Sequence, residues 1–197
     1  MRSACLAAAL VLLPINANAH LVGVEFGDFY AGSLHLMLAP EHVAAMLVVG
    51  LIGAQQSLEV ARWGLIALPL GLLMGCLLSL ILVPGGFVDP LVAVSLAVGG
   101  CVGIAALRLP VVLVTALATL VGLIHGYANA VSAIGTPVDL FLYLSGIAAA
   151  GSVLGTLGLA CATALMRWKE WVPLASRVLS SWIATVGVLM VGLALLR

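Results

Sequence analysis

Two histidines, a glutamate and a methionine occupy one short stretch of an otherwise apolar segment. They are His35, Glu41, His42 and Met46, inside the apolar residues 30–54. A charged side chain near the bilayer centre costs about 2.5 to 3.5 kcal/mol, so ionisable groups at that depth indicate a functional site. Imidazole, carboxylate and thioether groups together suit first-row divalent transition metals, whereas magnesium and calcium prefer oxygen ligands. The stretch therefore predicts a site or path for a transition-metal cation.

The composition places these residues in a membrane protein. Of the 197 residues, 64% are hydrophobic and 7% are charged, and the mean hydropathy is +1.33. Apolar stretches of about 20 residues recur along the chain, which is typical of helical membrane proteins in a lipid bilayer. The formal net charge is zero and the basic residues form no cluster, which argues against nucleic acid as a partner. The connecting segments are too short for a soluble catalytic domain and no Walker motif is present, so neither an enzyme nor an ATP-driven transporter is expected.

The first residues have the pattern of a secretory signal peptide. Arg2 gives a positive start, residues 4–13 form an apolar core too short to span a bilayer, and small residues precede Ala19. This pattern predicts cleavage after Ala19 and a mature chain that begins at His20, with an uncleaved anchor helix as the alternative. The amine and imidazole of an N-terminal His20 could chelate a metal, although a solvated tether is an equally good interpretation.

The rest of the chain, residues 20–197, is expected to form one all-α membrane domain. Apolar periodicity and length predict six spans, at 30–54, 62–83, 90–107, 110–132, 139–166 and 174–196. Cleavage puts the mature N-terminus outside, and an even number of spans returns the C-terminus to that side. The inside loops and the start of the last span then carry Arg62, Arg108, Arg167, Lys169 and Arg177, as the positive-inside rule requires. We expect a bacterial inner membrane location with both mature ends in the periplasm.

Spacing limits how the ligands of the first span can cooperate. His35 and His42 are seven positions apart on one helix face, which in a regular helix separates them by about 10 Å along the axis. One ion cannot bridge that distance. Pro40 should kink or open the helix just before Glu41. The pattern therefore fits either a distorted single site or two successive stations along a path, with Met46 one turn beyond His42.

A third histidine comes from the predicted fourth span. At about 1.5 Å per residue, His125 lies about 8 Å below the outer boundary, where His35 also lies, while His42 lies about 18 Å below it. Asn129 follows His125 by one turn, and Tyr127 and Tyr143 could add hydrogen bonds. Each polar group could instead bond across helices without any metal.

Glycine pairs spaced four apart predict close helix packing, because small residues let helix backbones approach in a membrane. His125 lies inside one such pair, Gly122 and Gly126. The cysteines left after signal cleavage lie inside predicted spans and are interpreted as packing residues rather than ligands; they are Cys76, Cys101 and Cys161.

These residues resemble the HupE/UreJ family of small membrane proteins associated with nickel or cobalt uptake. The family's first-span motif, H-P-x-x-G-x-D-H-x-x-A-M, corresponds to His35, Glu41, His42, Ala45 and Met46. Its fourth-span motif, F-H-G-x-A-H-G, corresponds to His125, Gly126, Ala128 and Asn129. The resemblance covers the whole mature chain and implies a functional link to hydrogenase or urease maturation.

The chain departs from the family pattern at several positions. Glu41 replaces an aspartate, Ala39 a glycine, and the proline has moved to position 40. Asn129 stands where the family has a second histidine, so this site has fewer imidazoles.

The sequence thus predicts a secondary permease that brings Ni²⁺, or alternatively Co²⁺, into the cytoplasm. A dication moving inward gains about 4.6 kcal/mol per 100 mV of membrane potential, at about 2.3 per charge, so ATP is not required. The predicted metal ligands are His35, Glu41, His42, Met46, His125 and Asn129, with His20 as a further candidate. No resident cofactor is expected, and a homo-oligomer is compatible with the sequence. The alternatives are a metal-sensing or metalloenzyme-assembly protein without flux and an intramembrane metalloenzyme.

Overall fold

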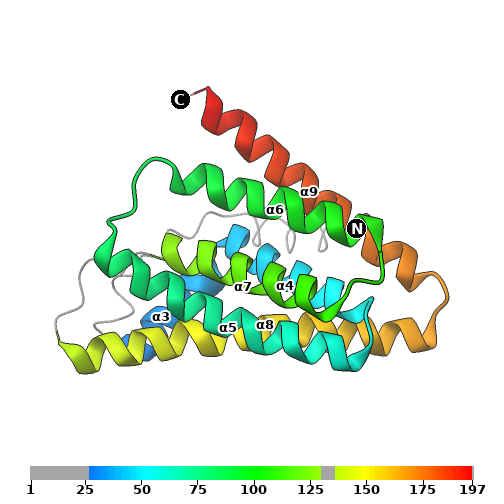
Figure 1. The fold of residues 1–197 in the computed structure, drawn as a ribbon, viewed down its shortest axis with the longest axis horizontal. Helices are drawn as coiled ribbons and strands as arrows, with labels where there is room; N and C mark the ends of the chain where they lie inside the picture. The colour runs from blue at the N-terminus through cyan, green and yellow to red at the C-terminus, as the bar shows by residue number, and fades with distance from the viewer. Residues whose placement is uncertain (1–26, 130–135, 197) are drawn as a thin grey trace, which may run out of the picture.

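The computed structural model describes residues 27–129 and 136–196, and every regular element in these ranges is an α-helix. The predicted signal peptide, 1–19, and His20 lie outside the described residues. Figure 1 shows the helices as a bundle of roughly antiparallel rods. The helices are α3 (Asp28–Leu38), α4 (Pro40–Ala54), α5 (Leu58–Ile81), α6 (Val88–Ala105), α7 (Val111–Ala128), α8 (Pro137–Trp168) and α9 (Val172–Leu195).

The first predicted span is broken into two helices, α3 and α4, which meet at an angle of 80°. Ala39 lies between them with φ −91° and ψ 108°, an extended conformation, and Pro40 begins α4. A proline disfavours the helical conformation in the residue before it, while its own fixed φ suits the first turn of a new helix. The predicted kink before Glu41 is therefore confirmed, and it is a complete break.

Length and hydropathy make the other five helices candidates to cross a membrane singly, and the bent pair α3–α4, counted as one broken span, is the sixth candidate. Many large apolar side chains stay exposed on the outside of the bundle; Ile81, Val83 and Leu195 are at least 80% exposed. Lipid rather than water is the suitable environment for such a surface. The prediction of an all-α, multi-pass membrane protein is confirmed for the described residues.

Glycines allow the closest helix contacts, as predicted. In α7, a methyl group added at Gly122 or Gly126 would collide with the backbone of α5 at Leu68 or Leu72. Similar close approaches join α3 to α8 and α6 to α9. The small residues therefore bring α7, and His125 with it, tightly against α5.

The helix α4 lies at the centre of the bundle and contacts each of the other described helices. Figure 1 shows α4 and α7 between the pair α6–α9 and the group α3, α5 and α8. Residues of α4 and α7 can therefore meet in the interior.

One end of the bundle is basic. Gln56, at the α4–α5 connection, donates from Nε2 to the Leu107 carbonyl at 3.0 Å and accepts at Oε1 from the Leu109 amide at 2.9 Å. Arg177, near the start of α9, donates to the Ile104 carbonyl at 2.8 Å. These bonds place the α4–α5 and α6–α7 connections and the start of α9 together, at the end that carries Arg62, Arg108, Arg167, Lys169 and Arg177.

Candidate metal-binding site

Two histidines from different spans form a buried pair at the centre of the bundle. The Nδ1 atoms of His42 and His125 lie 2.7 Å apart, and the rings meet edge to face with centroids 4.9 Å apart. His42 is 5% exposed and His125 is fully buried. His42 lies in the first turn of α4, immediately after the break, and His125 lies in the last turn of α7. The break therefore directs the start of α4 into the bundle, where its imidazole reaches α7.

The short distance between the two nitrogens has a chemical consequence. One Nδ1 must donate a hydrogen and the other must accept it, since both cannot carry hydrogen at this separation. With metal–nitrogen distances of about 2.1 Å, two nitrogens at adjacent octahedral positions lie about 3.0 Å apart, and at tetrahedral positions about 3.4 Å apart. The observed Nδ1–Nδ1 distance is thus within about 0.7 Å of the separation needed for both nitrogens to bind one ion in either geometry. A small separation of the rings and loss of the shared hydrogen would let both nitrogens bind one ion.

Ser95 of α6 completes the arrangement around His125. Its hydroxyl oxygen lies 2.9 Å from Nε2 of His125, and the hydroxyl donates to the Val92 carbonyl at 2.7 Å. Since its only hydrogen is used on Val92, the hydroxyl accepts from Nε2–H of His125. In a neutral imidazole this assignment leaves the lone pair on Nδ1, facing His42. Ser95 could not be predicted from the sequence, because one serine in an apolar helix carries no recognisable signal.

Asn129 supports the end of α7 that carries His125. Its side-chain nitrogen donates to the main-chain carbonyl of His125 at 2.6 Å, and its oxygen Oδ1 is buried without a hydrogen-bond partner. The predicted ligand is therefore adjacent to the pair and holds a free acceptor. A buried, unsatisfied amide oxygen is costly, so it marks a point where a water molecule or a cation would be stabilised.

Met46 lies one turn after His42 but is packed into the apolar core. It is fully buried in a cluster that includes Leu68 and Leu72, and a methyl group added at Gly151 would come within 3.6 Å of its sulfur. These contacts give Met46 a packing role in the structure.

His35 and Glu41 lie on opposite sides of the break. His35, near the end of α3, is half-buried with its ring 6.4 Å from that of Tyr143, measured between centroids. Glu41 is half-buried in the first turn of α4. In residues 27–129 and 136–196, no group of three or more His, Cys, Asp or Glu side chains is arranged to hold a metal ion. His35 and His42 therefore come from different helices, α3 and α4, joined at the break.

The two tyrosines and the cysteine considered in the sequence analysis, Tyr127, Tyr143 and Cys76, contact neighbouring side chains and backbone. Tyr127 stacks on Phe87 with ring centroids 6.1 Å apart, and Tyr143 lies against His35. Cys76 is buried, and its thiol donates to the Gly126 carbonyl at 3.2 Å. That bond ties α5 to the residue next to His125, in keeping with the packing role expected from the sequence.

The fold and the site define a class: a multi-pass helical membrane protein with a broken first span and a buried imidazole pair. The model of one protein family, described as HupE / UreJ protein, matches residues 8–190. The chain therefore belongs to the HupE/UreJ family, which is associated with nickel or cobalt transport and with urease or hydrogenase maturation. Among curated proteins and among solved structures, no match to the chain was found.

Proposed function

We propose that the protein is a secondary permease that carries a divalent transition metal, Ni²⁺ first and Co²⁺ second, across the inner membrane into the cytoplasm. The observation that carries the proposal is the 2.7 Å approach of His42 to His125 inside the bundle. Ionisable side chains inside membrane spans cost free energy, and where they occur they usually mark a functional site. Imidazole is a good ligand for nickel, cobalt and zinc.

The ion enters from the side opposite the basic end of the bundle. His35 beside Tyr143 is the first station, Glu41 attracts the cation at the break, and the His42–His125 pair is the second station. Broken helices are common at ion sites in transporters, because the freed carbonyls can take part in coordination. The basic end faces the cytoplasm under the positive-inside rule, with both mature ends in the periplasm.

The modest number of ligands suits transport. Conduction requires binding that is favourable enough for entry and weak enough for release. The second station offers two imidazole nitrogens and, next to His125, the free Asn129 oxygen, while Ser95 holds the far side of the His125 ring. This set does not close a four-ligand site, so exchange of the ion is not blocked.

Metal uptake into proteoliposomes that contain only this protein tests the proposal. With an inside-negative potential, the wild type should accumulate Ni²⁺, and His42→Ala should reduce the initial rate at least 10-fold. Met37→Ala, an exposed substitution on α3, is the matched control and should retain wild-type uptake. Competition by Co²⁺, Zn²⁺ and Cu²⁺ in the same vesicles gives the metal preference.

Two other results would replace the proposal. Metal binding without uptake would support a sensing or metalloenzyme-assembly role. A tightly held, stoichiometric metal that survives purification would support an intramembrane metalloenzyme.

A further inference from the structure

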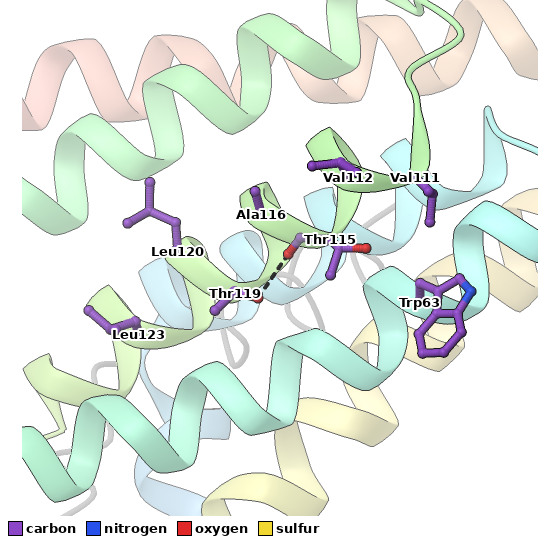
Figure 2. A pocket seen from close by; sticks show the side chains of 8 residues that line it. All are labelled: Trp63, Val111, Val112, Thr115, Ala116, Thr119, Leu120 and Leu123. Atoms are coloured by element: carbon purple, nitrogen blue, oxygen red, sulfur yellow. Dashed lines mark hydrogen bonds between the residues drawn. The ribbon is translucent and has the colours of Figure 1, made fainter.

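A groove runs along the outer face of α7, on the side away from the histidine pair. Its volume is about 690 Å³. Figure 2 shows Trp63 extending from α5 beside the first turns of α7, with the other lining residues distributed along α7. They are Val111, Val112, Thr115, Ala116, Thr119, Leu120 and Leu123.

The interior of the groove presents apolar atoms. Thr119 donates its hydroxyl hydrogen to the Thr115 carbonyl at 2.9 Å, so that donor is already used within α7 (Figure 2). Between Val111 and Leu123 the groove follows the helix axis for about 18 Å, at about 1.5 Å per residue. One leaflet of the hydrocarbon core is about 15 Å thick, half of the whole. The length and lining therefore fit one lipid acyl chain.

A cation lies at the end of the groove formed by Trp63. The guanidinium carbon of Arg62 is 5.8 Å from the centroid of the Trp63 ring, and Arg62 is exposed. Indole rings lie preferentially at the level of lipid headgroups, and a guanidinium presents paired donors that match phosphate oxygens. Arg62 is thus placed where a headgroup would be if an acyl chain filled the groove.

The surrounding charge favours an anionic lipid. The described residues at this end of the bundle include five basic side chains, Arg62, Arg108, Arg167, Lys169 and Arg177, against two acidic ones, Glu59 and Glu170. Clusters of basic residues beside membrane spans attract anionic headgroups.

We propose that this groove binds one anionic phospholipid, with an acyl chain along α7 and the headgroup phosphate on Arg62. This inference concerns a site separate from the metal path, and it stands whether or not the protein transports metal. Because α7 carries His125 on its other face, the lipid would cover the outer side of the helix that forms half of the imidazole pair.

Native mass spectrometry of the full-length protein with defined lipids tests the proposal. Purified protein is exchanged into detergent with equal amounts of dioleoyl phosphatidylglycerol and dioleoyl phosphatidylcholine. The wild type should retain one phosphatidylglycerol per chain in preference to phosphatidylcholine. Arg62→Gln should reduce that retention about 10-fold, whereas Arg167→Gln, an exposed arginine at the same end on α8, should not.

A second variant measures the contribution of the apolar groove to lipid binding separately from that of the Arg62 charge. Ala116→Phe, which fills the groove, should lower retention of both lipids while the thermal unfolding of the protein stays unchanged. Equal retention of the two lipids by the wild type and by Arg62→Gln would overturn the proposal. Cross-linking of Thr115→Cys into disulfide-linked dimers in lipid vesicles would also overturn it, because a second copy of the chain would then occupy the groove.

Discussion

The Nδ1 atoms of His42 and His125 lie 2.7 Å apart although 83 positions separate the two residues in the chain. This contact depends on two local features: the break at Ala39, which turns α4 inward, and the glycine face that seats α7 against α5. The proposed second station lies at this contact.

Ser95→Ala should weaken metal binding without unfolding the protein. The hydroxyl accepts a hydrogen bond from Nε2 of His125 and so keeps the lone pair of Nδ1 toward His42. Loss of a partner that orients a metal-binding histidine costs about 10-fold to 100-fold in affinity. Isothermal titration of Ni²⁺ into the purified protein measures this loss, and ¹⁵N shifts of His125 report its tautomer.

The matched control for this serine is Ser152→Ala, which removes a hydroxyl bonded only within its own helix, to the Ala148 carbonyl. It should leave Ni²⁺ affinity unchanged. If both serine variants lose affinity equally, Ser95 has no specific role in orienting His125.

His35→Ala should slow entry and preserve the inner station. His35 is on α3, across the break from His42, and its ring centroid lies 6.4 Å from that of Tyr143 on α8. We expect the concentration of Ni²⁺ for half-maximal uptake to rise several-fold, while one ion per chain still binds in titration. Loss of all binding in this variant would show that His35 and His42 hold the same ion.

Gly122→Ala should destabilise the bundle, and Gly192→Ala should not. A methyl group at Gly122 would meet the α5 backbone at Leu68, whereas one at Gly192 meets no atom within 4 Å. Overpacking costs about 1 to 3 kcal/mol, while an exposed helical glycine replaced by alanine gains up to about 1 kcal/mol. Thermal unfolding in detergent should therefore fall for the first variant and stay equal or rise for the second. Equal melting temperatures in the two variants would contradict close α5–α7 packing.

Much of the fold could be predicted because lipid imposes simple rules on sequence. Continuous apolar segments mark spans, and Pro40 marks the break, since a proline removes a donor and restricts the residue before it. The predicted span 139–166 is a helix of Pro137–Trp168 in the structure. At its N-terminus the helix begins two residues earlier than predicted, after a capping box in which Thr136 and Asp139 bond each other's backbone amides.

The site could be predicted only in part, because spacing along one helix does not fix contacts between helices. The histidines carried a clear signal, since ionisable groups are rare in apolar spans. Which two histidines meet depends on the 80° angle of the break and on how α4 crosses α7. No sequence pattern encodes that angle or that crossing. Met46 matched a ligand pattern and yet packs in the core, since its thioether serves both roles equally well.

The most direct test of the central claim is a double-mutant cycle on Ni²⁺ uptake with His42→Ala, His125→Ala and the combined variant. If one ion binds both imidazoles, each single substitution removes the same interaction, so the double variant should transport no more slowly than either single one. Initial rates in proteoliposomes with equal protein content give the result. Independent, multiplicative losses from the two substitutions would contradict a shared ion at this pair.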